Sequence, residues 1–283
     1  MKGKLLIFVG LFYFLQGYSQ NLLTNPGFEA GGNGVGFGVS AAYNQMAATT
    51  QATSTPGDFG ILQYPKRLNS NDFYFVGDRT TGSGRMLVVD GTTAAGTPVF
   101  WAAGNNGNGI TTAVIGTTYY FSYWIRSVSD LVVDPATQAE ISVALTGGNL
   151  LTQIHGSVFA PLPEEGWKQV IYSFVATATT VEIELSNLNV NATGNDFAVD
   201  DFVLTDDLIV AVDVTNAQCV TPNDGAITVS AGFGGIPPYN YAIAGPVNDN
   251  NTTGFFTSLP PGVYTVTVTD SALPTATVQT LNN

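Results

Sequence analysis

The chain is short of the residues from which many proteins build cross-links and metal centres. It has one cysteine and one histidine among 283 residues, and only 10% of its residues are charged. The single cysteine, Cys219, allows no disulfide within the chain. Stability must therefore come from packed apolar cores and from any metal that oxygen ligands hold.

Catalytic patterns are also missing. No GxSxG, HExxH or CxxC motif occurs, and the one histidine, His155, is expected in a surface loop. Glu164 and Glu165 lie in a loop flanked by proline, whereas Glu182 and Glu184 alternate along one face of an expected strand. That spacing is typical of solvated acids rather than of a carboxylate pair across a cleft. We expect a protein that is not an enzyme.

Basic residues are few, with 8 Lys and Arg against 21 Asp and Glu and a net charge of −13. Such a surface repels nucleic acid and anionic membranes. It suits divalent cations and neutral partners better.

The N-terminus has the pattern of a secretory signal over residues 1–19. Lys2 and Lys4 precede the apolar run from Leu5 to Leu15, and Gly17 and Ser19 predict cleavage before Gln20. An uncleaved anchor is the alternative. No later segment is apolar enough to span a membrane, so we expect a secreted or cell-surface protein with no membrane insertion after cleavage.

The rest of the chain predicts an all-β fold. Thr117 to Val128 alternates strongly, with Tyr119, Phe121, Tyr123 and Ile125 expected on one face and Trp124 on the other. Leu22 and Leu23 are expected to begin a strand, and Asp90-Gly91 is a hairpin signal after a strand ending at Val89. Eight or nine strands between Leu22 and Leu204 is the number expected of a jelly-roll β-sandwich.

The stretch Asn195 to Leu204, NDFAVDDFVL, is a strand pattern interrupted by two adjacent carboxylates, Asp200 and Asp201. Neighbours on a strand face opposite sides. The alternation therefore sorts the apolar residues into Phe197, Val199 and Val203 on one face and Ala198, Phe202 and Leu204 on the other. A buried carboxylate needs a cation or several donors. The stretch is either the closing strand of a sandwich with one Asp on a metal ion, or an edge strand with two solvated acids.

Five motifs occur in the order found in a bacterial carbohydrate-binding module: NLLTNPGFE, TGSGRMLVVDG, TTYYFSYWIRSV, GWKQVIYSF and NDFAVDDFVL. Residues 20–207 resemble the CenC-type module, a galactose-binding-like jelly roll. The resemblance implies a structural calcium ion held by Glu29 and Asp200, with Asp201 as the alternative to Asp200 and with carbonyls near Gly27 and Gly84-Arg85. Calcium accepts six to eight oxygen ligands in irregular geometry. The alternative is that these are surface acids. The family usually has Asp-His where this chain has Asp78-Arg79, which puts any role of that histidine in doubt.

A second unit is expected over residues 208–283. It contains Cys219, an Asn-Asp-Gly turn at 223–225, GGIPPY at 234–239 and PGVYTVTV at 261–268. These motifs resemble the SprB-type repeat of exported Bacteroidetes adhesins, a small immunoglobulin-like β-sandwich. The family usually has a second cysteine after the final Asp, and here Cys219 lacks that partner.

The resemblances imply binding or adhesion at the cell surface, with a polysaccharide or surface glycan as the partner and other surface proteins as further partners. Aromatic side chains that could stack on sugar rings are Trp101, Trp124, Tyr43, Tyr64 and Tyr120. Each could instead be an ordinary core residue. The competing hypotheses are a structural adhesin or spacer without a glycan site, and an accessory module of a glycoside hydrolase system.

Overall fold

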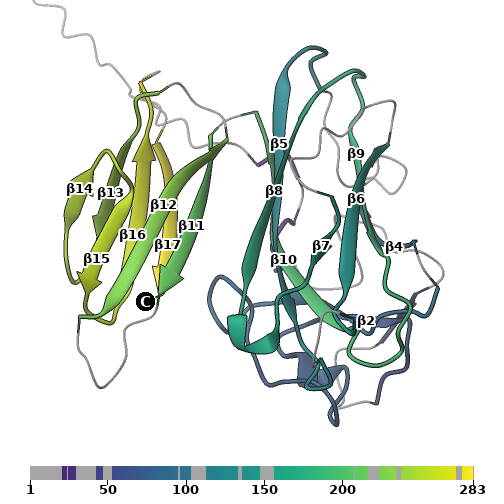
Figure 1. The fold of residues 1–283 in the computed structure, drawn as a ribbon. Helices are drawn as coiled ribbons and strands as arrows, with labels where there is room; N and C mark the ends of the chain where they lie inside the picture. The colour runs from purple at the N-terminus through teal and green to yellow at the C-terminus, as the bar shows by residue number, and fades with distance from the viewer. Residues whose placement is uncertain are drawn as a thin grey trace, which may run out of the picture.

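The protein is an all-β molecule built from two β-sandwiches (Figure 1). A computed structural model describes residues 21–23, 25–29, 43–46, 53–94, 96–102, 113–132, 136–146, 156–206, 208–215, 223–233, 237–271 and 276–282. Within these ranges the helices are two 3-10 turns, η1 (Pro65–Arg67) and η3 (Pro163–Glu165). Of the described helices, neither has the length and apolar character needed to cross a membrane.

The first sandwich has the two facing sheets of a jelly roll. One sheet has the order β1-β2-β3-β10-β5-β8, with bounds β1 Asn44–Gln45, β2 Asp58–Leu62, β3 Met86–Val89, β10 Phe197–Thr205, β5 Thr118–Ser127 and β8 Lys168–Val175. The other has the order β4-β9-β6-β7, with bounds β4 Thr97–Ala102, β9 Glu182–Asn187, β6 Glu140–Thr146 and β7 Val158–Phe159. The expected all-β fold with a jelly-roll sandwich is confirmed.

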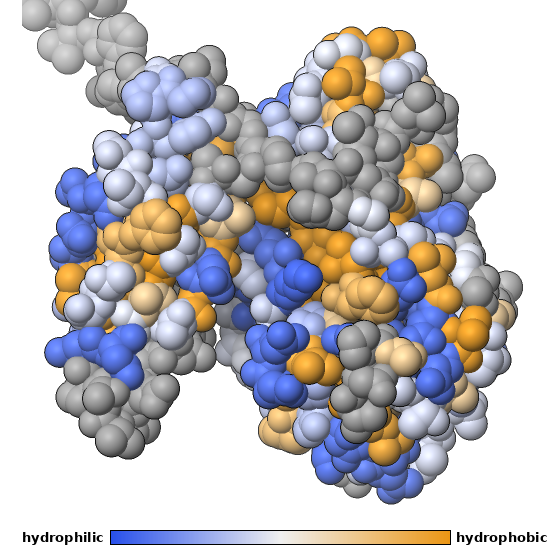
Figure 2. All heavy atoms as spheres, in the orientation of Figure 1, coloured by the Kyte–Doolittle hydropathy of each residue, from blue (hydrophilic) through white to orange (hydrophobic). Residues whose placement is uncertain are grey.

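The second sandwich is smaller and immunoglobulin-like, and it follows β10 directly. Its sheets have the orders β11-β12-β15 and β14-β13-β16-β17. The bounds are β11 Ile209–Thr215, β12 Gly225–Phe233, β15 Phe255–Leu259, β14 Asp249–Asn251, β13 Asn240–Ala244, β16 Val263–Thr269 and β17 Ala276–Asn282. In Figure 1 the sheet that contains β11 and β12 is the one nearer to the first sandwich. Figure 2 shows the surface hollowed between the two sandwiches.

Strand β5 follows the predicted alternation. Tyr119, Phe121, Tyr123 and Ile125 are all buried in the core between the two sheets. The side chains between them face outward from the sandwich, where Trp124 and Arg126 are covered by loops instead of by the second sheet. A period of two is enough to make this assignment, because one face of the strand is strongly apolar.

Strand β10 does not follow the predicted alternation. A register shift separates Asp200 from Val203 in the pairing with β5, and Asp201 has a positive φ of 49°. This β-bulge adds one residue to β10, so Phe202 returns to the core face on which Phe197 and Val199 already lie. The expectation that Phe202 faces away from Val199 is therefore wrong.

Two further local expectations are wrong. Leu22 and Leu23 form no strand, although the Leu22 N–H donates to the Leu204 carbonyl oxygen at 2.8 Å. The Asp90-Gly91 signal does not close a hairpin, because β3 and β4 belong to different sheets. Asn195 occupies the space beside Gly91: a Cβ there would lie 1.9 Å from the Asn195 carbonyl oxygen. The glycine is needed for this close approach rather than for a tight turn.

Candidate functional site

Four carboxylates gather where β10 bulges. We call Glu29, Asp78, Asp200 and Asp201 the acidic cluster. They come from the turn over residues 25–29, from the loop before β3, and from β10 itself. The Phe202 N–H donates to the Pro26 carbonyl oxygen at 3.0 Å, which fixes the first turn against the bulge. The bulge therefore brings together acids that are far apart in the sequence.

Asp78 is held by the loop that follows it. Its carboxylate accepts backbone N–H bonds from Thr80 at 3.1 Å, Thr81 at 2.9 Å and Gly84 at 2.7 Å. Three N–H donors and the Thr81 hydroxyl compensate one carboxylate well. The loop over residues 80–84 thus wraps around Asp78.

Asp200 has less compensation. Its side chain is buried, and it accepts N–H bonds from Arg79 at 3.0 Å and from Asp201 at 2.9 Å. Burial, with the charge of Asp201 as the second cause, raises the pKa of Asp200 to about 8. The neutral form of Asp200 is favoured only while no cation compensates the charge of its carboxylate. Of the four carboxylates in the acidic cluster, Asp200 therefore has the greatest need of a cation.

Two glycines let the carboxylates approach one another. A Cβ on Gly84 would lie 2.0 Å from Glu29 Oε1 and 2.9 Å from Asp78 Oδ2. A Cβ on Gly27 would lie 3.3 Å from Asp201 Oδ1 and 3.9 Å from Asp200 Oδ1. The predicted ligands Glu29, Asp200 and Asp201 and the predicted position Gly27 therefore lie in one neighbourhood.

Arg85 enters this neighbourhood through its backbone. Its N–H donates to Glu29 Oε1 at 2.8 Å. Among the residues that the structure describes, no three His, Cys, Asp or Glu side chains form a ready-made metal cage. The backbone carbonyls near Gly27 and Arg85 are predicted to supply further calcium ligands, and this role stays a prediction.

Arg79 is the cation beside the cluster. Its Nη1 lies 3.8 Å from Asp201 Oδ2, and its guanidinium carbon lies 4.0 Å from the centroid of the Trp124 ring. Burial lowers the pKa of Arg79, which the neighbouring Asp201 and Asp200 partly offset. Arg79 is thus a cation that joins the acidic cluster to Trp124.

A second pair of buried acids lies elsewhere in the first sandwich. Asp90 and Asp196 share a hydrogen bond, the Ser54 hydroxyl donates to Asp90 at 2.6 Å, and the Gly91 N–H donates to Asp196 at 3.1 Å. Burial, and then the charge of Asp90, raises the pKa of Asp196 to about 7. The pair therefore holds a proton that the unfolded chain releases.

This pair predicts that the stability of the protein falls as the pH rises. The pKa of this carboxyl is near its ordinary value of 3.8 in the unfolded chain and about 7 in the folded protein, so the folded state binds more protons between those pH values. With calcium present, thermal unfolding should show Tm falling from about pH 4 to pH 7 and levelling above it. Asp196→Asn should flatten that slope. An unchanged slope in this variant would contradict the assignment.

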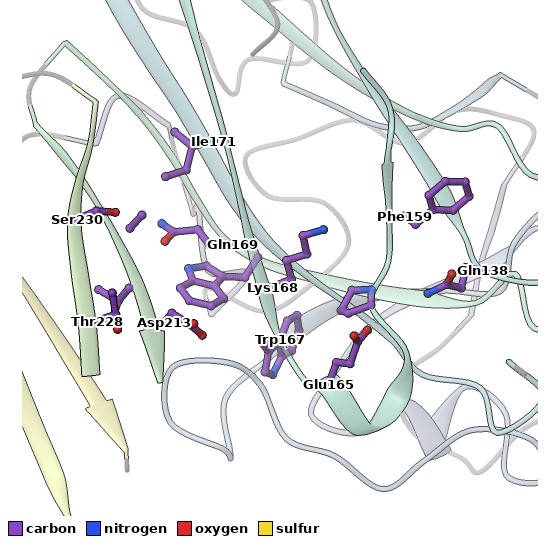
Figure 3. A pocket seen from close by; sticks show the side chains of 14 residues that line it. Gln138, Phe159, Glu165, Trp167, Lys168, Gln169, Ile171, Asp213, Thr228 and Ser230 are labelled. Carbon is purple, nitrogen blue, oxygen red and sulfur yellow. The ribbon is translucent and has the colours of Figure 1, made fainter. Parts of the chain in front are cut away.

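A cleft of about 530 Å³ lies between the two sandwiches (Figure 3). We call it the cleft. The first sandwich contributes the edge strand β8, the loop before it and the neighbouring Trp124, and the second contributes β11 and β12. The lining residues are Trp124, Gln138, Phe159, Pro161, Glu165, Trp167, Lys168, Gln169, Ile171, Ala211, Val212, Asp213, Thr228 and Ser230. Its volume falls in the range of roughly 300–1,000 Å³ usual for small-ligand sites.

Each of the two tryptophans of the cleft has a guanidinium over its ring. Arg79 lies over Trp124, and Arg126 lies 5.6 Å from the centroid of Trp167. Arg126 is fixed in turn by the Pro163 carbonyl oxygen, which accepts from Nη2 at 3.4 Å. Cation–π contacts of this kind hold the indole rings in place.

Gln169 supplies a polar group with unused capacity. It lies on β8 directly opposite Trp124 of β5, and Figure 3 shows it on the side of β8 that faces Ser230. Its Oε1 is buried and accepts no hydrogen bond from any described residue. A buried acceptor left unpaired costs free energy, and a ligand hydroxyl could pair with it only after the Gln169 side chain turned toward the cleft.

The predicted sugar-stacking residues are not brought together. Tyr43 is buried in the core of the first sandwich. The prediction that its ring contacts a ligand is therefore wrong, because the ring packs against other core residues. Tyr64 stacks on the exposed Phe75 at 4.3 Å, away from the cleft lining. Tyr120 is half-buried on β5. Trp101 lies in β4 opposite Glu184, and its side chain lies outside the described residues. Trp124 alone lines the cleft, although it is only 8% exposed.

The sequence analysis missed Trp167, Phe159 and Gln169 as ligand candidates. Trp167 precedes β8 in a stretch that reads as an ordinary strand start, and nothing in its local pattern indicates a cleft. Phe159 is 41% exposed, which is unusual for so large an apolar ring. No local sequence pattern around Phe159 predicts that exposure. The signal that was available is the pairing of Pro161 and Pro163 before Trp167, which keeps this loop outside the sheets.

The acids considered as a catalytic pair lie in different places. Glu164 and Glu165 are exposed on η3, and the Leu162 N–H donates to Glu165 Oε2 at 2.7 Å. Glu182 and Glu184 are half-buried on β9 of the other sheet. His155 and Cys219 lie outside the described residues, as do the signal residues 1–19.

The second sandwich is related to a known family. Residues 211–248 match the model of the SprB repeat. This match supports the SprB resemblance over residues 211–248. We call the second sandwich, β11–β17, the repeat from here on. SprB repeats occur in exported or cell-surface proteins. No curated protein matches the chain.

Solved structures resemble the chain only distantly. An arabinose-bound GH51 α-L-arabinofuranosidase is 13% identical with a TM-score of 0.43, and the match covers 68% of this chain and 27% of that one. The CBM22-1 xylan-binding domain of Xyn10C from Paenibacillus barcinonensis is 10% identical with a TM-score of 0.34, and the match covers 66% of this chain and 95% of that one. The chain therefore corresponds to about a quarter of the arabinofuranosidase.

Proposed function

We propose that this is an exported, non-catalytic surface protein that binds a neutral polysaccharide or surface glycan in the cleft. The observation that carries the proposal is the cleft lining, in which Trp124 and Trp167 stand beside amide, hydroxyl and carboxylate side chains. Sugar rings present an apolar face to an aromatic ring and a rim of hydroxyls to polar groups, so this combination suits them. In this proposal the first sandwich is a carbohydrate-binding module of the CenC kind.

Calcium is proposed as a structural ion of that module. Glu29, Asp200 and Asp201 would hold it, with Asp78 close by and backbone carbonyls completing the oxygen ligands. The support is the crowding of carboxylates around Gly27 and Gly84 and the poorly compensated burial of Asp200. Bound calcium would supply positive charge to the bulge and fasten the turn at residues 25–29 to β10.

Export is proposed from the predicted signal peptide together with the SprB match. The strongly acidic chain fits a surface on which nucleic acid and anionic lipid are not partners. Other surface proteins are further proposed partners, since the repeat family is found in such proteins.

The proposal predicts that Trp167→Ala weakens polysaccharide binding strongly. Loss of one stacking ring in a small site should reduce affinity by about tenfold or more. The measurement is retardation of the full chain in native gels containing soluble β-glucan, xylan, galactomannan or arabinan, and pull-down with cellulose and chitin, all with calcium present.

The matched control is Phe75→Ala, which removes an exposed ring that is not part of the cleft lining. This variant should bind as the wild type does. If the folded wild type binds no member of the panel, the protein is better explained as a structural adhesin or spacer. If Trp167→Ala binds as well as the wild type, the cleft is not the site.

A further inference from the structure

We infer that the repeat is part of the saccharide site and does not merely display it: the ligand lies between the two sandwiches and contacts both. This inference rests on the proposed function and adds to it the identity of the second wall. Five of the 14 residues that line the cleft belong to β11 and β12 of the repeat, which is a substantial share of its surface.

The wall on the repeat is a row of side chains set by strand register. Asp213 of β11 pairs with Thr228 of β12, and Thr228 pairs with Phe255 of β15. Directly paired residues of antiparallel strands share a face. Because Val212, Val229 and Phe256 fill the core of the repeat, this row must face outward.

The chemistry of the row matches that of the opposite wall. Across the three paired strands, the row presents the carboxylate of Asp213, the hydroxyl of Thr228 and the ring of Phe255. Asp213 and Thr228 both line the cleft. Phe255 is the next residue along and is 63% exposed, so a large apolar ring stands uncovered beside the cleft. An exposed aromatic in line with two polar groups is a second surface on which a sugar ring could stack.

The wall on the repeat faces the side of the cleft that β8 forms. Figure 3 shows Gln169 and Ile171 on the side of β8 toward Thr228, Asp213 and Ser230, with Phe159 and Gln138 lying farther off. A saccharide bound there would lie against the β8 side chains and exchange hydrogen bonds with Asp213 and Thr228.

The charges of the cleft define the ligand class further. Glu165, Lys168 and Asp213 are the ionisable side chains that line it, giving an excess of one negative charge. This lining disfavours polyanionic glycans such as uronic-acid polymers or sulfated chains, because like charges repel in a partly desolvated site. The ligand is therefore a neutral oligosaccharide segment with hydroxyls on both edges.

The test is a double variant in the full chain, Asp213→Ala with Thr228→Val, which removes the polar groups of the repeat wall. It should weaken binding to the polysaccharide of the panel that retards the wild type most by about tenfold, since two hydrogen bonds are lost. The matched control is Asp249→Ala with Thr265→Val, which makes the same changes on the opposite sheet of the repeat. The control should bind within twofold of the wild type.

A second readout does not depend on affinity. If the ligand touches both sandwiches, saturating polysaccharide should raise the unfolding temperature of the repeat as well as that of the first sandwich. Differential scanning calorimetry of the wild type reports both. The double variant should lose the shift of the repeat and keep part of the other.

The outcomes separate this inference from the proposed function. Binding lost in Trp167→Ala but unchanged in the Asp213/Thr228 variant, with no shift of the repeat, would confine the site to the first sandwich and overturn the inference alone. Binding unchanged in Trp167→Ala would overturn both. Binding weakened by either set of changes, and by neither control, supports both.

Discussion

Asp200→Asn is expected to abolish the response of the protein to calcium. In the wild type, a calcium concentration of about 100 to 1,000 times the dissociation constant should raise the free energy of unfolding of the first sandwich by about 2–4 kcal/mol. For a domain of this size that is a rise in Tm of roughly 5–15 °C. The variant should show no such rise, because asparagine cannot supply the negative charge that holds the ion.

The same variant should behave differently without calcium. The pKa of Asp200 is raised to about 8, so near pH 8 its buried and partly ionised carboxylate destabilises the metal-free wild type. Asparagine removes that charge and loses the bond from the Arg79 N–H. The two effects oppose each other, and the calcium-free variant should lie within about 1 kcal/mol of the calcium-free wild type. A mutation that simply damaged the fold would lower stability in both conditions.

Two further variants complete this test, which is thermal unfolding with calcium or with a chelator. Glu29→Gln should also lose the calcium response, whereas Asp206→Asn, at an exposed position just after β10, should keep it. Retention of the full shift by both Asp200→Asn and Glu29→Gln would show that the acidic cluster does not bind the ion.

Phe202→Ala is expected to have the largest effect on stability. The Phe202 ring is 1% exposed and lies 5.5 Å from the ring of Phe28, 5.8 Å from that of Phe121 and 5.7 Å from that of Tyr123. Removing it leaves a cavity among three aromatic rings and should cost about 3–5 kcal/mol. The measurement is chemical denaturation of the full chain, followed by the fluorescence of its three tryptophans.

Phe75→Ala is the control for this change, since it makes the same substitution in the same sandwich at a ring that is 67% exposed. It loses the stack on Tyr64 and should cost about 0.5–1.5 kcal/mol. Equal losses in the two variants would mean that Phe202 is not in the core and that β10 has no bulge.

The bulge also shows where prediction from the sequence stops. The pattern NDFAVDDFVL left open a closing strand with one buried acid or an edge strand with two solvated acids, and the structure places β10 between β3 and β5 with Asp200 buried. The pattern could not indicate that Asp201 adopts a positive φ, because that conformation is stabilised by distant partners. The Phe202 N–H bonds to Pro26, and the Thr80 hydroxyl donates to Asp201.

By itself the sequence determined the all-β class, the jelly roll, the family of the repeat, and the neighbourhood of the predicted metal ligands. These rest on local alternation and on motifs, which short-range sterics and burial impose on each segment. Only the tertiary structure decided that Tyr43 fills a core, that Phe202 turns inward, and that Trp167 stands at a cleft. The exposure of a ring and the partner of a carboxylate depend on segments that approach from far along the chain, and no local pattern contains them.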